Sequence, residues 1–425
     1  MASNTPDTPD TPDTPDTITL TAQCHCRSLA FTSSPIPRSF LPLKATNCHC
    51  NSCRHLTGSL RGSSDILWPG PPPPSSDLLK KYVFSPRLSI YFCGHCSTTL
   101  FWEDNSTPGT TNYLVFTGIL NTVQPLNPGE RLVEWEAHMF LSDTIDGGAV
   151  NWLNGLNGPG SPKPKRWLGW KDKSVQVNPQ GIYPDFSSKV FLRYDENLLA
   201  TEGEEGNIPV KCHCGGVSFF LGAGQGQRDF KERQARGEQL PWFVDPVTYK
   251  FLGTLDGCDD CRICSGVDLF AWTFAELKHI YFSDGKETLP TDTTKLKEST
   301  GKDPRLGTLA LYASSEGVQR YHCGRCSAVV FYACESRPDM VDIAVGLLHA
   351  PESARAERVI SWSWGGKLGF GTDMKGTWRE HLAAMTEEET EQFRIARGFP
   401  KNFRRILKEQ GASSAQAVPG GSGQV

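Results

Sequence analysis

The sequence predicts a mainly β protein made of two tandem domains, with short helices and a C-terminal helix. The chain has 425 residues, and at about 150 residues per domain this length suggests two or three domains. Fourteen of the 15 cysteines fall into six short groups, three in each half and in the same order. The segments between these groups are short, rich in β-branched and aromatic residues, and bounded by Gly, Pro and Asn.

Composition and charge exclude several classes of protein. Hydrophobic residues make up 38%, and no apolar run approaches the roughly 18 residues of a membrane-spanning helix. The first 20 residues lack the basic and apolar regions of a secretory signal. The net charge of −4 comes largely from a tail with four aspartates, so the near-neutral body disfavours nucleic-acid binding. We therefore expect a cytoplasmic protein without a membrane partner, and the sequence leaves a nuclear location open.

The two ends of the chain differ in composition from its body. The TPD repeat from Thr5 to Thr17 predicts a disordered tail over residues 1–17, and the Gly/Ser-rich end predicts a flexible tail over 411–425. Between them we expect a first domain over 18–185, a second over 208–375 and a helical segment over 376–410.

Strand signals dominate the body, and one helical pattern closes it. Strands are expected at Leu88–Phe92, Tyr113–Phe116, Val133–Leu141 and Val341–Val345. A helix is expected from Trp378 to about Ala396, because Leu382, Met385 and Phe393 would share one face. Gly398 and Pro400 would end this helix, and Phe403–Glu409 would form a further turn or two.

The cysteine motifs repeat. Cys24-His25-Cys26 recurs as Cys212-His213-Cys214, and Cys93-Gly94-His95-Cys96 recurs as Cys323-Gly324-Arg325-Cys326. A third cluster lies between these two in each half, at 48–53 and at 258–264. Repetition over this length indicates two copies of a whole folding unit.

Clustered cysteines without a secretory signal indicate metal ligands rather than disulfides. Each half has seven of them, which divide into four and three. Four thiolates close a tetrahedral structural zinc site. The predicted sites are Cys24, Cys26, Cys93 and Cys96 in the first half, and Cys212, Cys214, Cys323 and Cys326 in the second.

The remaining three cysteines of the first half are Cys48, Cys50 and Cys53. Three thiolates would leave one coordination position of a zinc ion open, as catalytic zinc requires. The alternatives are reduced structural thiols, or a closed site with a fourth protein ligand. The histidines beside the ligands, His25, His49 and His213, are expected to face solvent or support the ligands rather than bind the metal.

This order of motifs resembles the glutathione-dependent formaldehyde-activating enzyme and centromere protein V family, over about residues 20–185 and 208–375. The resemblance implies a β-tent fold with two zinc ions per domain, one structural and one catalytic on Cys48, Cys50 and Cys53. It also implies carbon–sulfur lyase chemistry, the reversible addition of the glutathione thiol to formaldehyde. The expected substrate is thus a small thiol or carbonyl compound.

His138 matches a histidine-bearing strand of that family. We expect it either to relay protons or contact substrate, beside the catalytic Cys48, Cys50 and Cys53, or to be a strand histidine with its hydrogen bonds satisfied. The sequence leaves both readings open.

The second copy departs from the first at its middle cluster, Cys258-Asp259-Asp260-Cys261-Arg262-Ile263-Cys264. Matching Cys261 and Cys264 to Cys50 and Cys53 places Asp259 opposite Cys48. Zinc would then be held by Cys258, Cys261 and Cys264, or by Asp259 in place of a thiolate. The nearest counterpart of the His138 strand, 358–361, has no histidine, so we expect the first half to carry the chemistry.

The sequence therefore predicts a zinc-dependent carbon–sulfur lyase-type enzyme. Two alternatives remain at this stage. One is a non-enzymatic zinc-binding interaction module, and the other is a zinc enzyme with changed chemistry, such as a dehydratase or cyclase.

Overall fold

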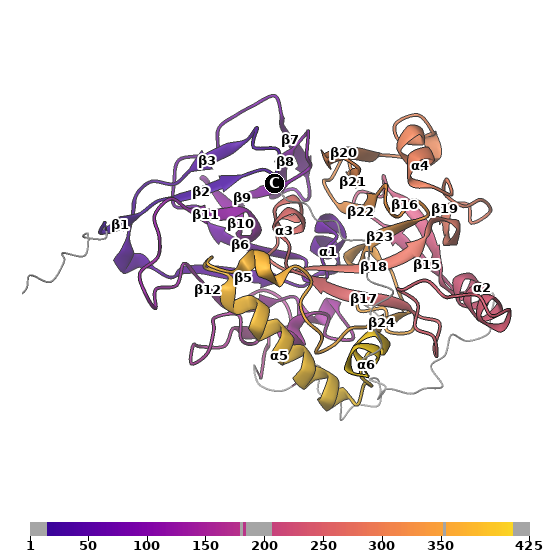
Figure 1. The fold of residues 1–425 in the computed structure, drawn as a ribbon. Helices are drawn as coiled ribbons and strands as arrows, with labels where there is room; N and C mark the ends of the chain where they lie inside the picture. The colour runs from indigo at the N-terminus through magenta and orange to yellow at the C-terminus, as the bar shows by residue number, and fades with distance from the viewer. Residues whose placement is uncertain (1–14, 179–181, 184–205, 352–353, 411–425) are drawn as a thin grey trace, which may run out of the picture.

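A computed structural model describes residues 15–178, 182–183, 206–351 and 354–410 (Figure 1). The expected tails over residues 1–14 and 411–425, and most of the expected boundary region between the domains, lie outside these ranges. The end of the N-terminal tail is ordered, contrary to expectation. Thr17 and Ile18 form a strand, and the backbone N–H of Arg38 donates to the carbonyl of Asp16 at 3.0 Å.

The first half is built from fourteen strands and one α-helix within the described residues. Short 3₁₀ turns join several of them. The elements are β1 (Thr17–Ile18), β2 (Leu20–Gln23), β3 (Ala30–Thr32), β4 (Ile36–Pro37), β5 (Leu43–Cys48), α1 (Asn51–Thr57), β6 (Ser63–Leu67), β7 (Leu79–Val83), β8 (Leu88–Cys93), β9 (Thr99–Thr107), β10 (Thr110–Phe116), β11 (Leu120–Thr122), β12 (Val133–Met139), β13 (Lys165–Trp167) and β14 (Gln176–Val177).

The second half has fewer strands and more helix. Its elements are β15 (Asn207–Lys211), β16 (Ser218–Gly222), α2 (Ala223–Ala235), β17 (Phe251–Asp256), α3 (Asp259–Ser265), β18 (Phe270–Glu276), β19 (Ile280–Phe282), α4 (Thr293–Ser299), β20 (Leu309–Ser315), β21 (Val318–Cys323), β22 (Val329–Cys334), β23 (Met340–Ala344) and β24 (Ile360–Trp362). Two C-terminal helices follow, α5 (Glu380–Arg397) and α6 (Phe403–Glu409). The strands expected in both halves and the C-terminal helices are therefore present, and the fold is mainly β.

The large sheets of the two halves have the same strand order. The first contains the run β7-β8-β9-β10-β6-β5-β12, extended by β13 and β14, and the second is β20-β21-β22-β23-β18-β17-β24. In each sheet the last of these seven strands pairs in parallel with its neighbour, β12 with β5 and β24 with β17. A three-stranded sheet accompanies each, β11-β2-β3 in the first half and β15-β16-β19 in the second.

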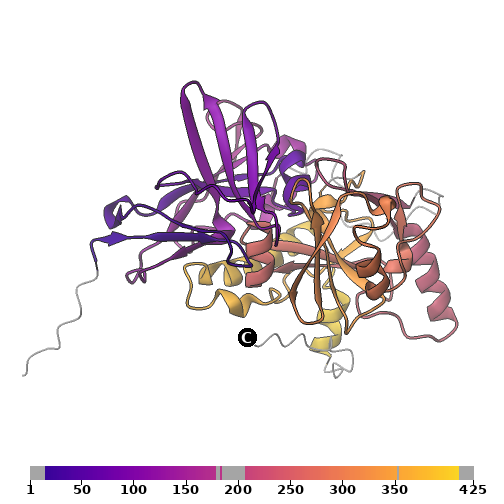
Figure 2. The ribbon, with the colours of Figure 1, turned by 90° about the horizontal axis from the view of Figure 1, so that it is seen from above.

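The two halves lie side by side, with α1 and α3 near their junction (Figures 1 and 2). Each helix ends on a glycine whose carbonyl accepts a hydrogen bond from the other half. Gly346 N–H donates to Gly58, and Gly118 N–H donates to Gly266, both at 2.9 Å. A Cβ atom on Gly58 would lie 2.4 Å from the carbonyl oxygen of Val329, so the halves approach too closely there for any side chain.

The predicted apolar face of the C-terminal helix packs on both halves. Leu382, Met385 and Phe393 of α5 are buried. The ring of Phe393 lies 5.5 Å from that of Trp152 in the first half and 5.6 Å from that of Trp364 in the second. The helix therefore fastens the halves together, as Figure 1 shows in yellow. In the part of the chain that the structure describes, no helix has the length and apolar character needed to cross a membrane.

Candidate metal centres

Four cysteines of the first half converge where β2 and β8 end. Cys24 and Cys26 lie in the turn after β2, Cys93 ends β8, and Cys96 lies in the turn before β9. The Sγ atoms of Cys24 and Cys26 are 3.4 Å apart and those of Cys26 and Cys93 are 3.7 Å apart. Zinc–sulfur bonds of about 2.3 Å in a tetrahedron place sulfurs roughly 3.8 Å apart, so these four thiols fit a closed zinc site.

The second half repeats this arrangement with Cys212, Cys214, Cys323 and Cys326, whose Sγ atoms also lie within 4.8 Å of one another. The sulfurs of Cys212 and Cys214, and those of Cys214 and Cys323, are 3.5 Å apart. Backbone amides favour the thiolate form in both groups. Leu29 N–H donates to Cys24 Sγ at 3.3 Å, and Val217 N–H donates to Cys212 Sγ at 3.2 Å.

The three remaining cysteines predicted in the first half also converge. Cys48 is the last residue of β5, Cys50 caps the N-terminus of α1, and Cys53 lies in its first turn. Their sulfurs lie within 4.8 Å of one another, and Cys53 N–H donates to Cys50 Sγ at 3.3 Å. Among the described residues, no fourth Cys, His, Asp or Glu side chain joins the group.

The three thiols of this trio differ in their pKa values. Hydrogen bonds from Cys48 and then Cys53 lower the pKa of Cys50 to about 3, whereas the pKa values of Cys48 and Cys53 are raised. Neighbouring thiolates repel one another, so one ionises while the others donate hydrogen bonds to it. A divalent cation would remove this repulsion and deprotonate all three.

Two polar side chains hold the start of α1 beside these sulfurs. The carboxylate of Asp143 accepts a hydrogen bond from Asn51 N–H at 3.2 Å. The buried guanidinium of Arg54 donates to Asn51 Oδ1 at 3.0 Å and to the carbonyls of Gly346 and Leu348 at 3.3 and 3.2 Å. The first trio is therefore anchored partly on the second half.

The middle cluster of the second half has a different register from the expected one. Cys258 caps the N-terminus of α3 as Cys50 caps α1, and Cys261 N–H donates to its sulfur at 3.2 Å. Asp256 ends β17 where Cys48 ends β5. The donor atoms that come together are those of Asp256, Cys258 and Cys261, all within 4.8 Å of one another.

Two expected ligands of the second half do not join this group. Cys264 lies three residues beyond Cys261, almost a full helical turn along α3, so its buried sulfur is carried away from the helix N-terminus. Asp259 Oδ1 instead accepts hydrogen bonds from Arg262 at 2.6 and 3.2 Å. Matching Cys261 and Cys264 to Cys50 and Cys53 is therefore wrong, because the helix cap shifts the correspondence by three residues.

His138 is a buried strand histidine with both ring nitrogens engaged. Its Nε2 lies 3.1 Å from the carbonyl of Leu153, which can only accept, so Nε2 carries the hydrogen. Its Nδ1 then accepts from Nε2 of His49 at 2.9 Å. Burial, aided by nearby positive charge, lowers the pKa of His49 to about 3 and that of His138 well below its usual range. The geometry therefore favours the reading of His138 as a satisfied strand histidine.

The other histidines beside the ligands also have defined partners. His49 is fully buried rather than facing solvent, and it supports the fold through His138. His25 reaches across the junction to the hydroxyl of Tyr312 at 3.0 Å, and His213 reaches that of Tyr82 at 2.8 Å. Each Cys-His-Cys turn is thus fastened to the β-hairpin of the opposite half.

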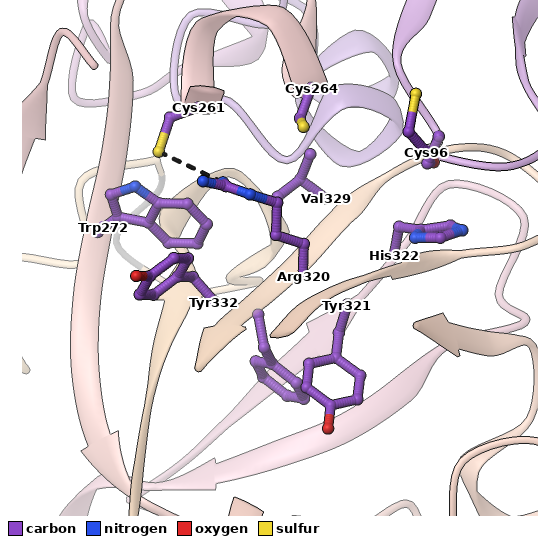
Figure 3. A pocket seen from close by; sticks show the side chains of 11 residues that line it. Cys96, Cys261, Cys264, Trp272, Arg320, Tyr321, His322, Val329 and Tyr332 are labelled. Carbon is purple, nitrogen blue, oxygen red and sulfur yellow. Dashed lines mark hydrogen bonds between the residues drawn. The ribbon is translucent and has the colours of Figure 1, made fainter. Parts of the chain in front are cut away.

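Sequence reasoning missed Asp256 and Arg320. The spacing Asp-x-Cys-x-x-Cys, identical to Cys-x-Cys-x-x-Cys in the first half, is the signal that could have found Asp256. Arg320 projects from β21 toward the second trio, with Nη1 3.8 Å from Cys261 Sγ and Nη2 2.9 Å from Asp260 Oδ2 (Figure 3). It borders a cavity of about 20 Å³ that Cys264, Trp272 and Tyr332 also line.

Comparison with known proteins finds a similarity within the first half. The family model of the glutathione-dependent formaldehyde-activating enzyme matches residues 19–141, which contain all seven clustered cysteines of that half. No curated protein and no solved structure matches the chain. Over residues 19–141 the chain is therefore similar to the glutathione-dependent formaldehyde-activating enzyme family.

Proposed function

We propose that the protein is a zinc-dependent carbon–sulfur lyase-type enzyme whose reaction takes place at Cys48, Cys50 and Cys53. The observation that carries the proposal is the convergence of three thiols, without a fourth ligand among the described residues, in a region similar to this family. Three thiolates would hold a zinc ion with one position left for substrate. A glutathione hemithioacetal, or another adduct of a thiol with a small carbonyl compound, is the proposed substrate class.

In the reaction, the sulfur of the thiol forms a bond with the carbonyl carbon, and the thiol proton ends on the carbonyl oxygen. Zinc in this site would supply Lewis acidity to the carbonyl oxygen or stabilise the substrate thiolate. The protein's own contribution is to hold the three donors at the junction of β5 and α1. Asp143 and Arg54 fix the first residue of α1, so that Cys50 and Cys53 keep their positions relative to Cys48.

We further propose that the second half is a diverged copy of the same domain. The shared strand order, the matching four-cysteine group and the equivalent helix cap support this. All fifteen cysteines are free thiols, which supports a reducing, cytoplasmic location.

The test combines metal content with turnover. The purified chain would be assayed with glutathione and formaldehyde, following adduct formation by NMR. We expect zinc-dependent turnover that Cys50→Ser abolishes while the protein stays folded. Cys334→Ser is the matched control, because Cys334 is half-buried and lies outside every group of candidate ligands. Equal turnover in both variants would refute the proposal.

A further inference from the structure

We propose that Asp256, Cys258 and Cys261 form a second three-donor metal centre, with mixed carboxylate and thiolate ligands, that takes a zinc ion. This inference concerns metal binding and does not depend on the proposed reaction.

The first argument is local structure. In both halves a strand ends on a donor residue, a second donor caps the following helix, and a third lies three residues later in the first turn. The capping sulfur accepts the same backbone hydrogen bond, at 3.3 Å for Cys50 and 3.2 Å for Cys258. The start of each helix is held by an aspartate from a 3₁₀ turn, Asp143 in one half and Asp373 in the other. The donors of the second group thus point to one spot for the same reason as those of the first.

The second argument is charge. Asp256 and Cys261 are buried, with 8% and 7% of their surface exposed. Burying anionic groups this closely is unfavourable unless positive charge compensates them. A carboxylate and two thiolates carry three negative charges, and the guanidinium of Arg320, which also pairs with Asp260, cannot compensate them alone, so a divalent ion would supply the missing positive charge. In the first half the matching position in β8 is Ile90, since Ile90 pairs with Trp102 as Arg320 pairs with Tyr332.

The third argument separates this group from another cluster of acidic side chains. Asp229, Glu276 and His279 also lie within ligand distance of one another. There, however, Lys278 lies 2.8 Å from Asp229 and Arg233 lies 3.0 Å from Glu276, so the chain's own cations neutralise the carboxylates. At the second trio, the arginine contacts one sulfur at 3.8 Å and leaves the remaining donors to an ion.

The ligand set also sets the strength of binding. Carboxylate oxygen is a harder donor than thiolate sulfur, and thiolates are the donors that select zinc most strongly. The centre on Asp256 should therefore release its zinc to a chelator before the three-cysteine centre and before the two closed sites.

The centre is built on both halves. Asp260, between the two cysteine ligands, accepts from Arg320 on one oxygen and lies 2.9 Å from His25 Nε2 on the other. His25 itself lies between Cys24 and Cys26 of the first closed site. Cys96 and Ser97 of the first half line the adjacent cavity with Arg320 and His322 (Figure 3).

The experiment counts metal in the full chain, reconstituted with excess zinc and freed of loosely bound ions. The wild type should hold four zinc ions, and Asp256→Ala should hold three. Cys264→Ser is the matched control and should keep four, because it removes a buried thiol of the same helix that is not a donor. Asp256→Cys should keep four and should retain the fourth ion at higher chelator concentrations than the wild type. In cobalt-substituted protein, Asp256→Cys should also raise the thiolate-to-metal absorption by about one part in thirteen, because it adds one thiolate to the thirteen of the four wild-type centres.

Three results would overturn the proposal. The first is a wild type that holds three zinc ions together with a Cys50→Ser variant that holds two. The second is an Asp256→Ala variant that holds four zinc ions. The third is a Cys264→Ser variant that holds three zinc ions. If Asp256→Ala does not fold, the comparison of Asp256→Cys with the wild type in the chelator titration decides, and equal retention of the fourth ion would refute the assignment. The count of zinc ions does not require turnover, so failure of the lyase activity leaves this test intact.

Discussion

At the scale of single residues, equivalent positions in the large sheets of the two halves carry different side chains. His138 precedes Met139, which pairs with Cys48, and Leu368 precedes Gly369, which pairs with Asp256. A Cβ atom on Gly257 would lie 2.9 Å from Leu368 and 2.8 Å from Met374. Apolar side chains therefore occupy in the second half the space that His49 and His138 occupy in the first.

His138→Leu should consequently destabilise the fold rather than change the chemistry. The substitution leaves the Nε2 hydrogen of His49 buried without an acceptor, which costs about 1–3 kcal/mol. We expect a lower free energy of unfolding in urea and a pH–rate profile of unchanged shape. A shifted pH–rate profile with unchanged stability would instead make His138 a proton-transfer group.

The same pair makes stability depend on pH. Burial lowers the pKa of His49 from 6.5 to about 3, and that of His138 also falls. Between these pH values the unfolded chain binds more protons than the folded chain, so stability falls as the pH falls through this window. His138→Leu removes one of the two titrations, and its stability should fall less steeply between pH 6.5 and 4. Urea unfolding at a series of pH values measures both slopes, and identical slopes would contradict the assignment.

Cys96 offers the corresponding test of a closed site. The four thiols of this site join residues 24–26 to residues 93–96, so zinc bound there contributes directly to folding. Cys96→Ser should lose one zinc ion and several kcal/mol of stability, measured by elemental analysis and thermal unfolding. Cys334→Ser should change neither quantity. Full stability of Cys96→Ser without its zinc would show that the site does not support the fold.

At the scale of elements, the helices that carry the trios also form the junction between the halves. Gly58 ends α1 at φ +78°, a conformation that costs other residues about 1–2 kcal/mol. Gly109, in the turn between β9 and β10, has φ +76°, and a Cβ atom added there would have no neighbouring atom within 4 Å. The two glycines therefore share backbone strain and differ in crowding.

Gly58→Ala should thus destabilise the protein more than Gly109→Ala. Gly109→Ala loses stability only through backbone strain. The Cβ atom of Gly58→Ala would in addition clash with the carbonyl oxygen of Val329. We expect the extra loss to appear as a lower denaturant midpoint, together with weaker zinc retention, because α1 carries Cys50 and Cys53. Equal denaturant midpoints for the two variants would mean that the junction between the halves accommodates the added methyl group without a loss of stability.

Much of this arrangement could be predicted where the signal is local in sequence. The pairs Cys24/Cys26 and Cys93/Cys96 are recognisable by spacing, and the face of α5 by the period of Leu382, Met385 and Phe393. Asp256 was missed because Cys261 and Cys264 were aligned with Cys50 and Cys53, which placed Asp259 rather than Asp256 opposite Cys48.

Other features had no sequence signal. His25 contacts Asp260 and Tyr312, which lie 235 and 287 residues away in the sequence. No pattern of residue types predicts such contacts. The burial of His49 was also unexpected, because a histidine between two candidate ligands looks exposed until the strand that covers it is placed.

At the scale of the whole molecule, a buried ion network joins both halves to the C-terminal segment. Asp268 of the second half contacts Arg61 of the first half at 3.1 Å and Arg379, which precedes α5, at 2.7 Å. Burial opposes its ionisation, but the charges of Arg379 and Arg61 hold the pKa of Asp268 below its ordinary value. Arg379 also donates to the carbonyls of Thr117 and Leu120 in the first half.

Removal of residues 376–425 should therefore unfold both halves together. It leaves Asp268 with one arginine, and breaking a buried ion pair costs about 3–5 kcal/mol. It also removes Phe393 from between Trp152 and Trp364, a loss comparable to a buried Phe→Ala substitution at about 3–5 kcal/mol. Together these losses approach the whole stability of a typical domain, about 5–15 kcal/mol. Truncation after Gln410 is the control and should leave the thermal midpoint unchanged, because it spares α5 and α6. A chain ending at Lys375 that melts cooperatively near the wild-type midpoint with four zinc ions would show that the halves stand without the C-terminal helices.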